Sequence, residues 1–389
     1  MPISPTLCIL PWMHIATDAS GAIRVCCSSD ININKTRRAD GSVYKIFDTD
    51  ATDSWHSSTM TDIRKEMLEG KKPSMCKNCY IEESLKIDSA RIMANKKWMF
   101  EYEKTITPLR DIKYIDIRLG NLCNLKCRMC YPGSSSKWVN EFYLVDNSFN
   151  SSTFDYNAMN WPNNNEYIHT IKKISTTIRE ISLTGGEPTL IEKQYELYDY
   201  LISEGLAKNI ALRYNTNCTN IQPQMIEYWK KFKQVSVSLS IDAIGSLHRY
   251  IRHPAKWELV EKNIIRYKEL HDKNLIHMCI IPTVQIYSIF AIDKLLDYFY
   301  NMGVTDNDIY LGMLNSPSHL NIQTLPPELK LHLSEKLKNY KILTNVIEYM
   351  NAKSSFNEQW GNFKKYTRAL DVHRSENVIN EIPELGKYL

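Results

Sequence analysis

The sequence predicts an α/β protein with a partial (β/α)6 barrel, a small cysteine-rich N-terminal domain and a helical C-terminal extension. Six short apolar runs alternate with amphipathic stretches in the middle of the 389-residue chain, as in parallel β/α units joined by right-handed crossovers. Five of the ten cysteines lie in the turn-rich first 83 residues. After Met313 the strand pattern ends, and Pro326 to Leu389 is polar with helical spacing.

The predicted barrel consists of six strands and the helices between them. The strands are Tyr114 to Leu119, Glu180 to Thr184, Ile210 to Asn215, Val235 to Ile241, His277 to Val284 and Ile309 to Met313. The helices are Glu192 to Glu204, Gln222 to Phe232, Trp257 to Asp272 and Ile289 to Met302, with one more from Ser84 to Lys104 before the barrel. We divide the chain into a cysteine-rich domain (1–83), a helical linker (84–112), the barrel (113–315) and a C-terminal extension (316–389).

Composition and charge argue against several classes of protein. The 48 basic and 44 acidic residues give a formal charge of +4 without a long block of one sign, so neither nucleic acid nor a membrane surface is indicated as a partner. No run of about 18 apolar residues occurs, and the first ten residues lack a targeting pattern. We therefore expect a cytoplasmic protein whose cysteines are metal ligands or reduced thiols.

Three cysteines, Cys123, Cys127 and Cys130, lie on one short loop directly after the first predicted strand. Three thiolates can bind three irons of a [4Fe-4S] cube, which leaves the fourth iron open to a further ligand such as S-adenosylmethionine (SAM). The alternatives are a zinc site and a chance run of buried cysteines. Zinc prefers four ligands, commonly in CxxC pairs, and no His or Cys follows soon enough to complete such a site.

This CxxxCxxC loop resembles the signature of the radical SAM superfamily. The resemblance implies that Cys123, Cys127 and Cys130 hold the catalytic cluster, which cleaves SAM to methionine and a 5′-deoxyadenosyl radical that takes a hydrogen atom from the substrate. It also implies a barrel of the TIM type with its chemistry at the C-terminal strand ends. The family usually has an aromatic residue before the third cysteine, whereas this chain has Met129, which can still pack against an adenine ring.

The end of the second strand resembles the family motif that binds the SAM amino group. Gly185 and Gly186 allow a tight turn beside a ligand, and Glu187 can accept a hydrogen bond from an ammonium group. Taken alone, Gly-Gly-Glu-Pro is only a turn motif. Its position one β/α unit after the cysteine loop makes the resemblance specific.

The third and fourth strand ends carry further candidate SAM ligands. The stretch around Asn217 is similar to the Thr-Asn-Gly-Thr of relatives, with Cys218 in place of glycine and expected to pack rather than to react. Ser240 and Asp242 occupy positions that relatives use near the ribose, and Arg252 fits a ligand of the SAM carboxylate. The alternative for Arg252 is a solvated surface charge.

The N-terminal cysteines resemble an auxiliary-cluster module called twitch, a shortened SPASM domain, here placed before the barrel. The resemblance, which includes the spacing Gly21-x4-Cys26, implies a second [4Fe-4S] cluster. Its predicted ligands are Cys8, Cys26, Cys76 and Cys79. Cys27 is then a spare thiol or an alternate ligand. A structural zinc ion on the same four thiolates is the other interpretation.

The resemblance favours oxidation or cross-linking of a peptide or protein side chain, with oxidation or rearrangement of a sugar or nucleotide as the alternative. An electron donor such as flavodoxin or ferredoxin is an expected partner. The aromatic stretch from Ser134 to Glu166 is a candidate substrate lid. Two classes without catalysis are considered. An electron carrier would need neither Glu187 nor Arg252, and a zinc-stabilised binding module would show no iron absorbance.

Overall fold

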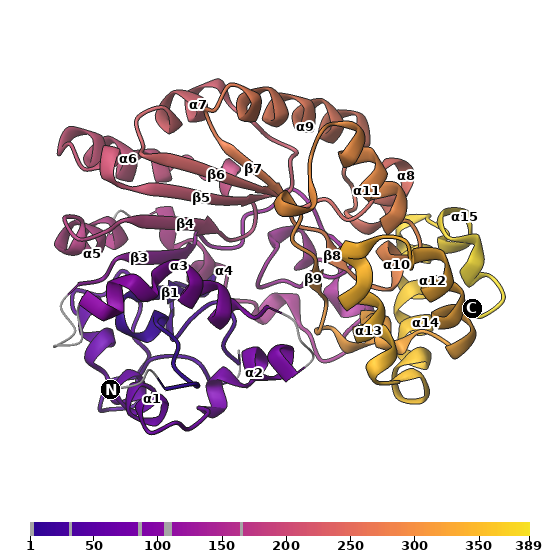
Figure 1. The fold of residues 1–389 in the computed structure, drawn as a ribbon, viewed down its shortest axis with the longest axis horizontal. Coiled ribbons are helices and arrows are strands. Elements are labelled where there is room, and N and C mark those ends of the chain that lie inside the picture. The colour runs from indigo at the N-terminus through magenta and orange to yellow at the C-terminus, as the bar shows by residue number, and fades with distance from the viewer. Residues whose placement is uncertain (1–3, 31–32, 85–87, 105–110, 164–165) are drawn as a thin grey trace. The chain divides into compact units, whose positions relative to one another are not determined.

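The structure is a computed structural model that describes residues 4–30, 33–84, 88–104, 111–163 and 166–389 (Figure 1). The chain forms two compact units. One consists of Met1–Leu122, Asp155–Tyr214 and Pro223–Val235, and the other of Cys123–Phe154, Asn215–Gln222 and Ser236–Leu389.

Seven strands form one mostly parallel sheet in the order β2-β1-β3-β4-β5-β6-β7. Their bounds are β1 His14–Thr17, β2 Ile23–Arg24, β3 Tyr114–Arg118, β4 Glu180–Thr184, β5 Ala211–Thr216, β6 Gln234–Leu239 and β7 His277–Ile280. A second sheet pairs β8 (Thr283–Val284) with β9 (Gly312–Met313). The predicted α/β class with a mostly parallel sheet is confirmed.

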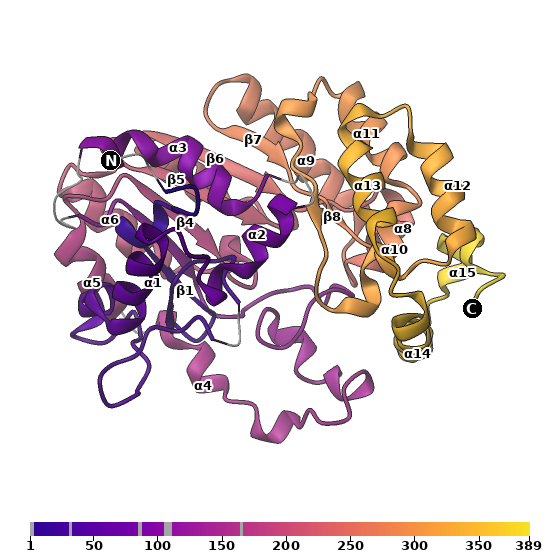
Figure 2. The same cartoon turned by 60° about the horizontal axis from the view of Figure 1, so that its bottom comes forward.

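Helices follow most of the strands, and the C-terminal part of the chain is helical, as predicted. The helices before β6 are α1 Ser58–Leu68, α2 Lys77–Ser84, α3 Ala90–Lys104, α4 Tyr156–Met159, α5 Glu166–Ile174, α6 Gln194–Ser203 and α7 Pro223–Trp229. Those after it are α8 Gly245–Ile251, α9 Trp257–Asp272, α10 Ile286–Ile289, α11 Ile292–Asn301, α12 Pro327–Leu337, α13 Thr344–Ala352, α14 Phe356–Arg374 and α15 Val378–Glu381. Figure 2 shows α12, α13 and α14 grouped together.

The last two predicted strands differ from the structure. The run from His277 to Val284 splits into β7 and β8 around Pro282, because proline has no backbone N–H to donate to a strand ladder. Of the run from Ile309 to Met313, only its last two residues form a strand, and Ile309 makes an isolated bridge to Ile280. The predicted helix from Ser84 to Lys104 is realised as α3, while residues 85–87 lie outside the described residues.

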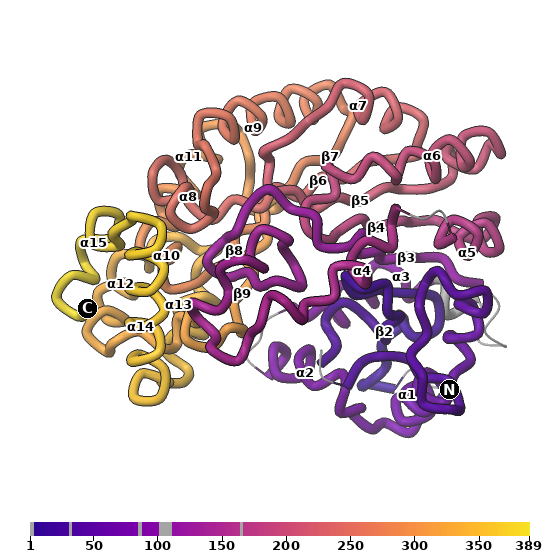
Figure 3. The backbone as a smooth tube through the Cα atoms, turned by 180° about the vertical axis from the view of Figure 1, so that it is seen from behind, coloured from indigo at the N-terminus to yellow at the C-terminus, as the bar shows by residue number. Residues whose placement is uncertain are grey.

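The N-terminal region contributes two strands that the sequence pattern does not predict as partners of the barrel strands. β1 pairs in parallel with β3, and β2, labelled in Figure 3, pairs antiparallel with β1. The cysteine-rich start of the chain is therefore built onto the sheet next to the strand that leads into the cysteine loop.

The sheet of the first unit has one apolar and one polar face. On the apolar face Ile115 and Ile117 align with Ile181 and Leu183, and all four are buried. Because side chains alternate along a strand, the other face carries a polar set: Tyr114, Asp116, Arg118, Glu180, Ser182 and Thr184. A polar face on a parallel sheet is unusual, since such sheets are normally apolar on both faces.

The predicted lid from Ser134 to Glu166 consists of short helical turns, and residues 164–165 lie outside the described residues. Its first part is anchored in the second unit, where Trp138 is fully buried and its Nε1 donates to the carbonyl of Cys127 at 2.9 Å. This part of the segment therefore packs against the cysteine loop. Among the described helices, none combines the length and the apolar character that a membrane span requires.

Candidate iron-sulfur and cofactor site

The three cysteines of the loop after β3 lie close together in the second unit. Cys123 and Cys127 are buried, Cys130 is partly exposed, and all three are reduced cysteines. A hydrogen bond between the thiols of Cys127 and Cys130 lowers the pKa of Cys127 and raises that of Cys130. The positive charge of Arg252 favours the thiolate form of both, but the net pKa of Cys130 stays raised. The backbone N–H of Leu125 donates to Cys123 Sγ at 3.4 Å. The sulfurs of this loop therefore lie near a backbone hydrogen-bond donor, Leu125 N, and near the positive charge of Arg252.

The loop is held by the C-terminal extension, a feature that the sequence analysis missed. Arg128 is fully buried, and its Nη2 lies 2.6 Å from both Asp371 Oδ1 and Glu376 Oε2. Its guanidinium also stacks over the ring of Tyr250 at 3.6 Å. Backbone hydrogen bonds tie the same loop to the end of α8 and to the residues after it, from Arg128 N to the carbonyl of Ile251 (2.8 Å) and from Lys126 N to that of His253 (2.7 Å).

Asn217 joins the end of β5 to the cysteine loop. Its Nδ2 donates to Asn124 Oδ1 at 3.0 Å and lies 3.8 Å from Cys123 Sγ. Its Oδ1 accepts from the backbone and hydroxyl of Thr219. The neighbouring Cys218 has a left-handed backbone with φ of 62°, a conformation that favours glycine. Cys218 is fully buried, in keeping with a packing role.

Asp242 and Arg252 form a buried pair. Arg252 Nε and Nη2 donate to the two oxygens of Asp242 at 2.8 and 3.0 Å, and Thr283 N donates to Oδ1 at 2.8 Å. Arg252 is only 7% exposed, so the alternative of a solvated charge is wrong. Within the part of the chain that is described, Arg252 Nη1 donates no hydrogen bond. Ser240, which is half-buried, donates its N–H to the carbonyl of Thr216.

Gly185, Gly186 and Glu187 lie against the start of the cysteine loop within the first unit. A Cβ on Gly186 would meet the carbonyl oxygen of Leu122 at 2.2 Å, and Glu187 N donates to the same oxygen at 2.8 Å. Only glycine permits this approach. Glu187 is buried, and its Oε1 accepts from the hydroxyl of Thr189 at 2.6 Å. Met129, in the second unit, is half-buried.

The four predicted auxiliary ligands gather in the first unit, although 71 residues separate the first from the last. Burial raises the pKa of Cys8, Cys26, Cys76 and Cys79, and the thiols of Cys26, Cys76 and Cys79 raise the pKa of Cys8 further. The four sulfurs are thus electrostatic neighbours. Cys27 is exposed, and its Sγ lies 3.8 Å from Ser28 Oγ. Burial raises the pKa of the nearby Asp116.

The donor set of both cysteine groups suits iron-sulfur clusters. Thiolates are the usual ligands of such clusters, with each cysteine bound to a different iron. Cys123, Cys127 and Cys130 can hold three irons of a cube, and Cys8, Cys26, Cys76 and Cys79 can hold four. Four thiolates also suit zinc, which stays the other interpretation for the N-terminal group.

Two family models match the chain at these two cysteine groups. The radical SAM superfamily model matches residues 117–296, and the model of SPASM, an iron-sulfur cluster-binding domain, matches residues 8–80. The chain carries a radical SAM domain. Its SPASM domain precedes the radical SAM domain, as predicted. The two domains imply [4Fe-4S] clusters and SAM as the cofactors.

A curated relative and several solved structures are similar to this radical SAM chain. The radical SAM cyclopropyl synthase TigE of Paramaledivibacter caminithermalis is 28% identical over 207 residues, which cover 52% of this chain and only 42% of TigE. The structure of native anSMEcpe with bound AdoMet and Kp18Cys peptide has a TM-score of 0.40 at 18% identity and covers 58% of this chain and 59% of that one. Streptococcus suis SuiB bound to precursor peptide SuiA has a TM-score of 0.35 at 15% identity, with 88% and 68% covered.

Proposed function

We propose that this radical SAM enzyme oxidatively modifies a side chain of a peptide or protein, assisted by an auxiliary cluster. The observation that carries the proposal is the presence of two separate thiol groups, three on the loop after β3 and four gathered from Cys8 to Cys79. The first group supports radical formation. The second supports removal of an electron from the product radical, so oxidation or cross-linking is the expected outcome.

In this proposal Cys123, Cys127 and Cys130 hold the SAM-binding cluster and leave one iron without a protein ligand. The cluster and SAM, when bound, supply one-electron cleavage of SAM and abstraction of a substrate hydrogen atom by the resulting 5′-deoxyadenosyl radical. The protein orients the sulfurs through Leu125 N and Asn217 Nδ2. Hydrogen bonds to cluster sulfurs tune the reduction potential.

Each motif supplies a side chain whose chemistry matches one part of the SAM molecule. Glu187 would accept hydrogen bonds from the SAM ammonium beside the Gly185-Gly186 turn. Arg252 would bind the SAM carboxylate through Nη1, because Asp242 already accepts from its Nε and Nη2. Asp242 is therefore proposed to position Arg252. Asn217, Ser240 and Met129 complete the contacts to the ribose and adenine.

The polar face of the sheet supports a polar substrate. Asp116 and Ser182 are buried there. Arg24, which is buried beside them on β2, has an Nε without a hydrogen-bond partner. Such groups can bind the amides and charged side chains of a peptide. They would also suit a sugar or nucleotide, which is the second candidate substrate class.

The test separates radical formation from product oxidation. We would incubate anaerobically reconstituted enzyme with dithionite, SAM and either a random peptide library or a pool of sugars and nucleotides, and analyse products by mass spectrometry. We expect peptides that have lost two hydrogen atoms. A Cys76→Ala/Cys79→Ala double variant should still release 5′-deoxyadenosine but yield no oxidised peptide, and Cys27→Ala is the matched control that retains both. Products confined to the small-molecule pool, or unchanged oxidation by the double variant, would contradict the proposal.

A further inference from the structure

The strand β9, the last one labelled in Figure 1, lies at an edge of its sheet in the second unit. Within the described residues β9 pairs with β8 alone, so its other side faces no strand. We call the run from Ile309 to Asn315, which contains β9, the β9 edge. Its hydrogen bonds to the preceding run start at every second residue: Tyr310 N to the carbonyl of Ile280 (2.8 Å), Gly312 N to that of Pro282 (3.0 Å) and Leu314 N to that of Val284 (3.0 Å).

The backbone groups between these residues point away from β8. Successive N–H and C=O groups alternate between the two sides of a strand, so those of Leu311 and Met313 lie on the open side. Within the part of the chain that the structure describes, the backbone groups of these two residues form no hydrogen bond. Both residues are half-buried, while Tyr310 and Gly312 are exposed. The edge therefore offers donors and acceptors about 7 Å apart to a further strand.

The β9 edge lacks the features that usually keep an open edge from pairing. Proteins generally protect such an edge with charged side chains, with proline or a bulge, or by covering it with another element. From Ile309 to Asn315 the chain has no charged residue and no proline, and Tyr310, Leu311, Met313 and Leu314 are bulky and uncharged. An edge of this kind is a template for an added strand.

The β9 edge is connected to the residues that we assign to SAM. Gly312 is in register with Thr283, whose backbone N–H donates to Asp242 Oδ1 at 2.8 Å. Asp242 in turn binds Arg252. Neighbouring strands lie about 4.8 Å apart, so a strand added outside β9 would lie about 10 Å from Thr283. A chain bound at this edge is therefore close to the proposed SAM carboxylate ligand.

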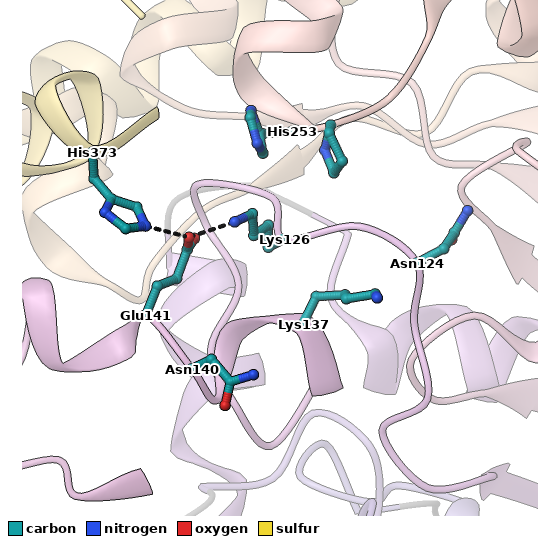
Figure 4. A pocket seen from close by; sticks show the side chains of 8 residues that line it. Asn124, Lys126, Lys137, Asn140, Glu141, His253 and His373 are labelled. Atoms are coloured by element: carbon teal, nitrogen blue, oxygen red, sulfur yellow. Dashed lines mark hydrogen bonds and ion pairs between the residues drawn. The ribbon is translucent and has the colours of Figure 1, made fainter. Parts of the chain in front are cut away.

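The pocket beside the cysteine loop is less suited to an extended chain. Its volume is about 610 Å³, and its main charged groups already bind one another. Figure 4 shows Lys126 and His373 pointing toward the carboxylate of Glu141, and His253 is paired with Glu376. These groups are not available to a peptide backbone, whereas those of the β9 edge are.

We propose that the β9 edge binds an extended segment of the peptide substrate by β-strand addition, with Leu311 and Met313 exchanging backbone hydrogen bonds with it. In this mode of recognition the main-chain hydrogen bonds provide the affinity. A second copy of the chain is a poorer match, because one short strand buries far less than the about 800 Å² per partner of a stable interface. The inference rests on the proposed function, because it takes the substrate to be a peptide.

Residue-resolved hydrogen exchange tests the pairing without measuring turnover. Anaerobically reconstituted enzyme with SAM is compared with and without an acetylated, amidated heptapeptide of alternating threonine and valine, a composition that favours strands. At saturating peptide we expect exchange of the Leu311 and Met313 amides to slow on the order of tenfold. The amides of Gly312 and Leu314, which already donate to the preceding run, should change little. Unchanged exchange at both Leu311 and Met313 would overturn the proposal.

A proline variant separates backbone pairing from side-chain contact. Met313→Pro removes one outward N–H, and an edge strand tolerates proline where that N–H faces away from the ladder. By fluorescence anisotropy of the labelled heptapeptide, we expect Met313→Pro to raise the dissociation constant on the order of tenfold. Met313→Ala, which keeps the N–H, should bind nearly as wild type does. If Met313→Pro fails to fold, the exchange pattern of the wild type still decides.

Lys137→Ala, at the pocket of Figure 4, is the control and should bind the heptapeptide as wild type does. Weaker binding by Lys137→Ala, with Met313→Pro unaffected, would place the peptide in the pocket and overturn the proposal. A dimer seen by light scattering and lost in Met313→Pro, without peptide binding, would assign the edge to a second copy of the chain and also overturn it.

The proposed function fails or stands separately. Unprotected Leu311 and Met313 amides, together with oxidised peptides from the library experiment, would overturn the β9 edge as a docking site and leave the proposed function standing. Products confined to sugars or nucleotides would instead overturn the proposed function, whatever the edge binds.

Discussion

The two cysteine groups differ in how the protein prepares them for metal. The three thiols after β3 lie within eight residues, and the chain fixes their loop through Trp138, Arg128 and the backbone of α8. The four N-terminal thiols come from distant positions in a region with few regular elements, and burial raises the pKa of every one. The first site is held in place by protein contacts. The second relies more on the metal, because binding must supply the energy that deprotonates and gathers its ligands.

Removing the metal should therefore have its largest effect on the N-terminal region. After anaerobic chelation we expect amide hydrogens of residues 4–30 and 33–84 to lose most of their exchange protection. The amides of Lys126 and Arg128, which donate to α8 and its C-terminal end, should keep theirs. Hydrogen exchange followed by mass spectrometry of peptides measures both regions in one sample. Loss of exchange protection in the cysteine loop, with protection kept in the N-terminal region, would show that the loop site depends more on its metal than the N-terminal site.

The next largest effect is expected from breaking the contact that holds the loop. Arg128→Gln leaves Asp371 and Glu376 without the cation between them, and removal of one partner of a buried pair costs about 3–5 kcal/mol. We expect a lower urea midpoint for the second unit and loss of iron from the loop site. Arg249→Gln, at an exposed position on α8, is the matched control. If Arg128→Gln kept full iron content and stability, the C-terminal network would have no role in holding the loop.

A smaller effect should follow from a methyl group at the start of the loop. Gly186→Ala places its Cβ 2.2 Å from the carbonyl oxygen of Leu122, which is backbone and cannot move aside cheaply. We expect a loss of about 1–3 kcal/mol in stability, as for other overpacked sites, together with weaker SAM binding by equilibrium dialysis. Gly133→Ala meets only the ring of the exposed Tyr131 and should be tolerated. Equal SAM affinity in both variants would show that SAM binding does not depend on the close approach of Gly186 to Leu122.

The smallest effect is a pH dependence shared by the two units. Burial, with the nearby charges of Arg24 and Arg252, lowers the pKa of His14 and His248 to about 3. Each histidine therefore contributes stability that is present above its ordinary pKa of about 6.5 and is lost as the pH falls toward 3. The expected slope is about 1.4 kcal/mol per pH unit for each histidine below pH 6.5. We would measure the free energy of unfolding by urea between pH 7 and 5.5. Its slope against pH should be smaller in His14→Gln, in the first unit, and in His248→Gln, in the second, than in the wild type. Unchanged slopes in both variants would contradict the assignment.

The sequence predicts those parts of the fold that short-range patterns determine. β4 and α9 agree with their predicted bounds because Glu180 to Thr184 alternates into a buried ladder and Trp257 to Asp272 has a clear apolar stripe. The sequence analysis did not predict β1 as a neighbour of the barrel strands. The four residues of β1 pair with β3, which lies far away in the chain, and short-range patterns do not indicate such pairing. The run from Ile309 to Met313 has strand composition, but pairing extends over only two residues in the structure.

The candidate site shows the same division. The spacing of Cys123, Cys127 and Cys130, and the position of the Gly185-Gly186 turn one β/α unit later, single out these residues through the family resemblance. Arg128 could not be recognised from the sequence, because its partners Asp371 and Glu376 are more than 240 residues away. The bidentate pairing of Arg252 with Asp242 likewise depends on tertiary placement, even though both residues were singled out from the sequence.

The most direct test of the two-site account is iron and sulfide analysis with electron paramagnetic resonance on anaerobically reconstituted protein. Wild type is compared with a Cys123→Ala/Cys127→Ala/Cys130→Ala triple variant, and both then receive dithionite and SAM. The account predicts about eight irons per chain in the wild type and about four in the variant, with SAM cleaved by the wild type alone. Zinc in place of iron, or SAM left intact by a reduced wild-type cluster, would contradict it.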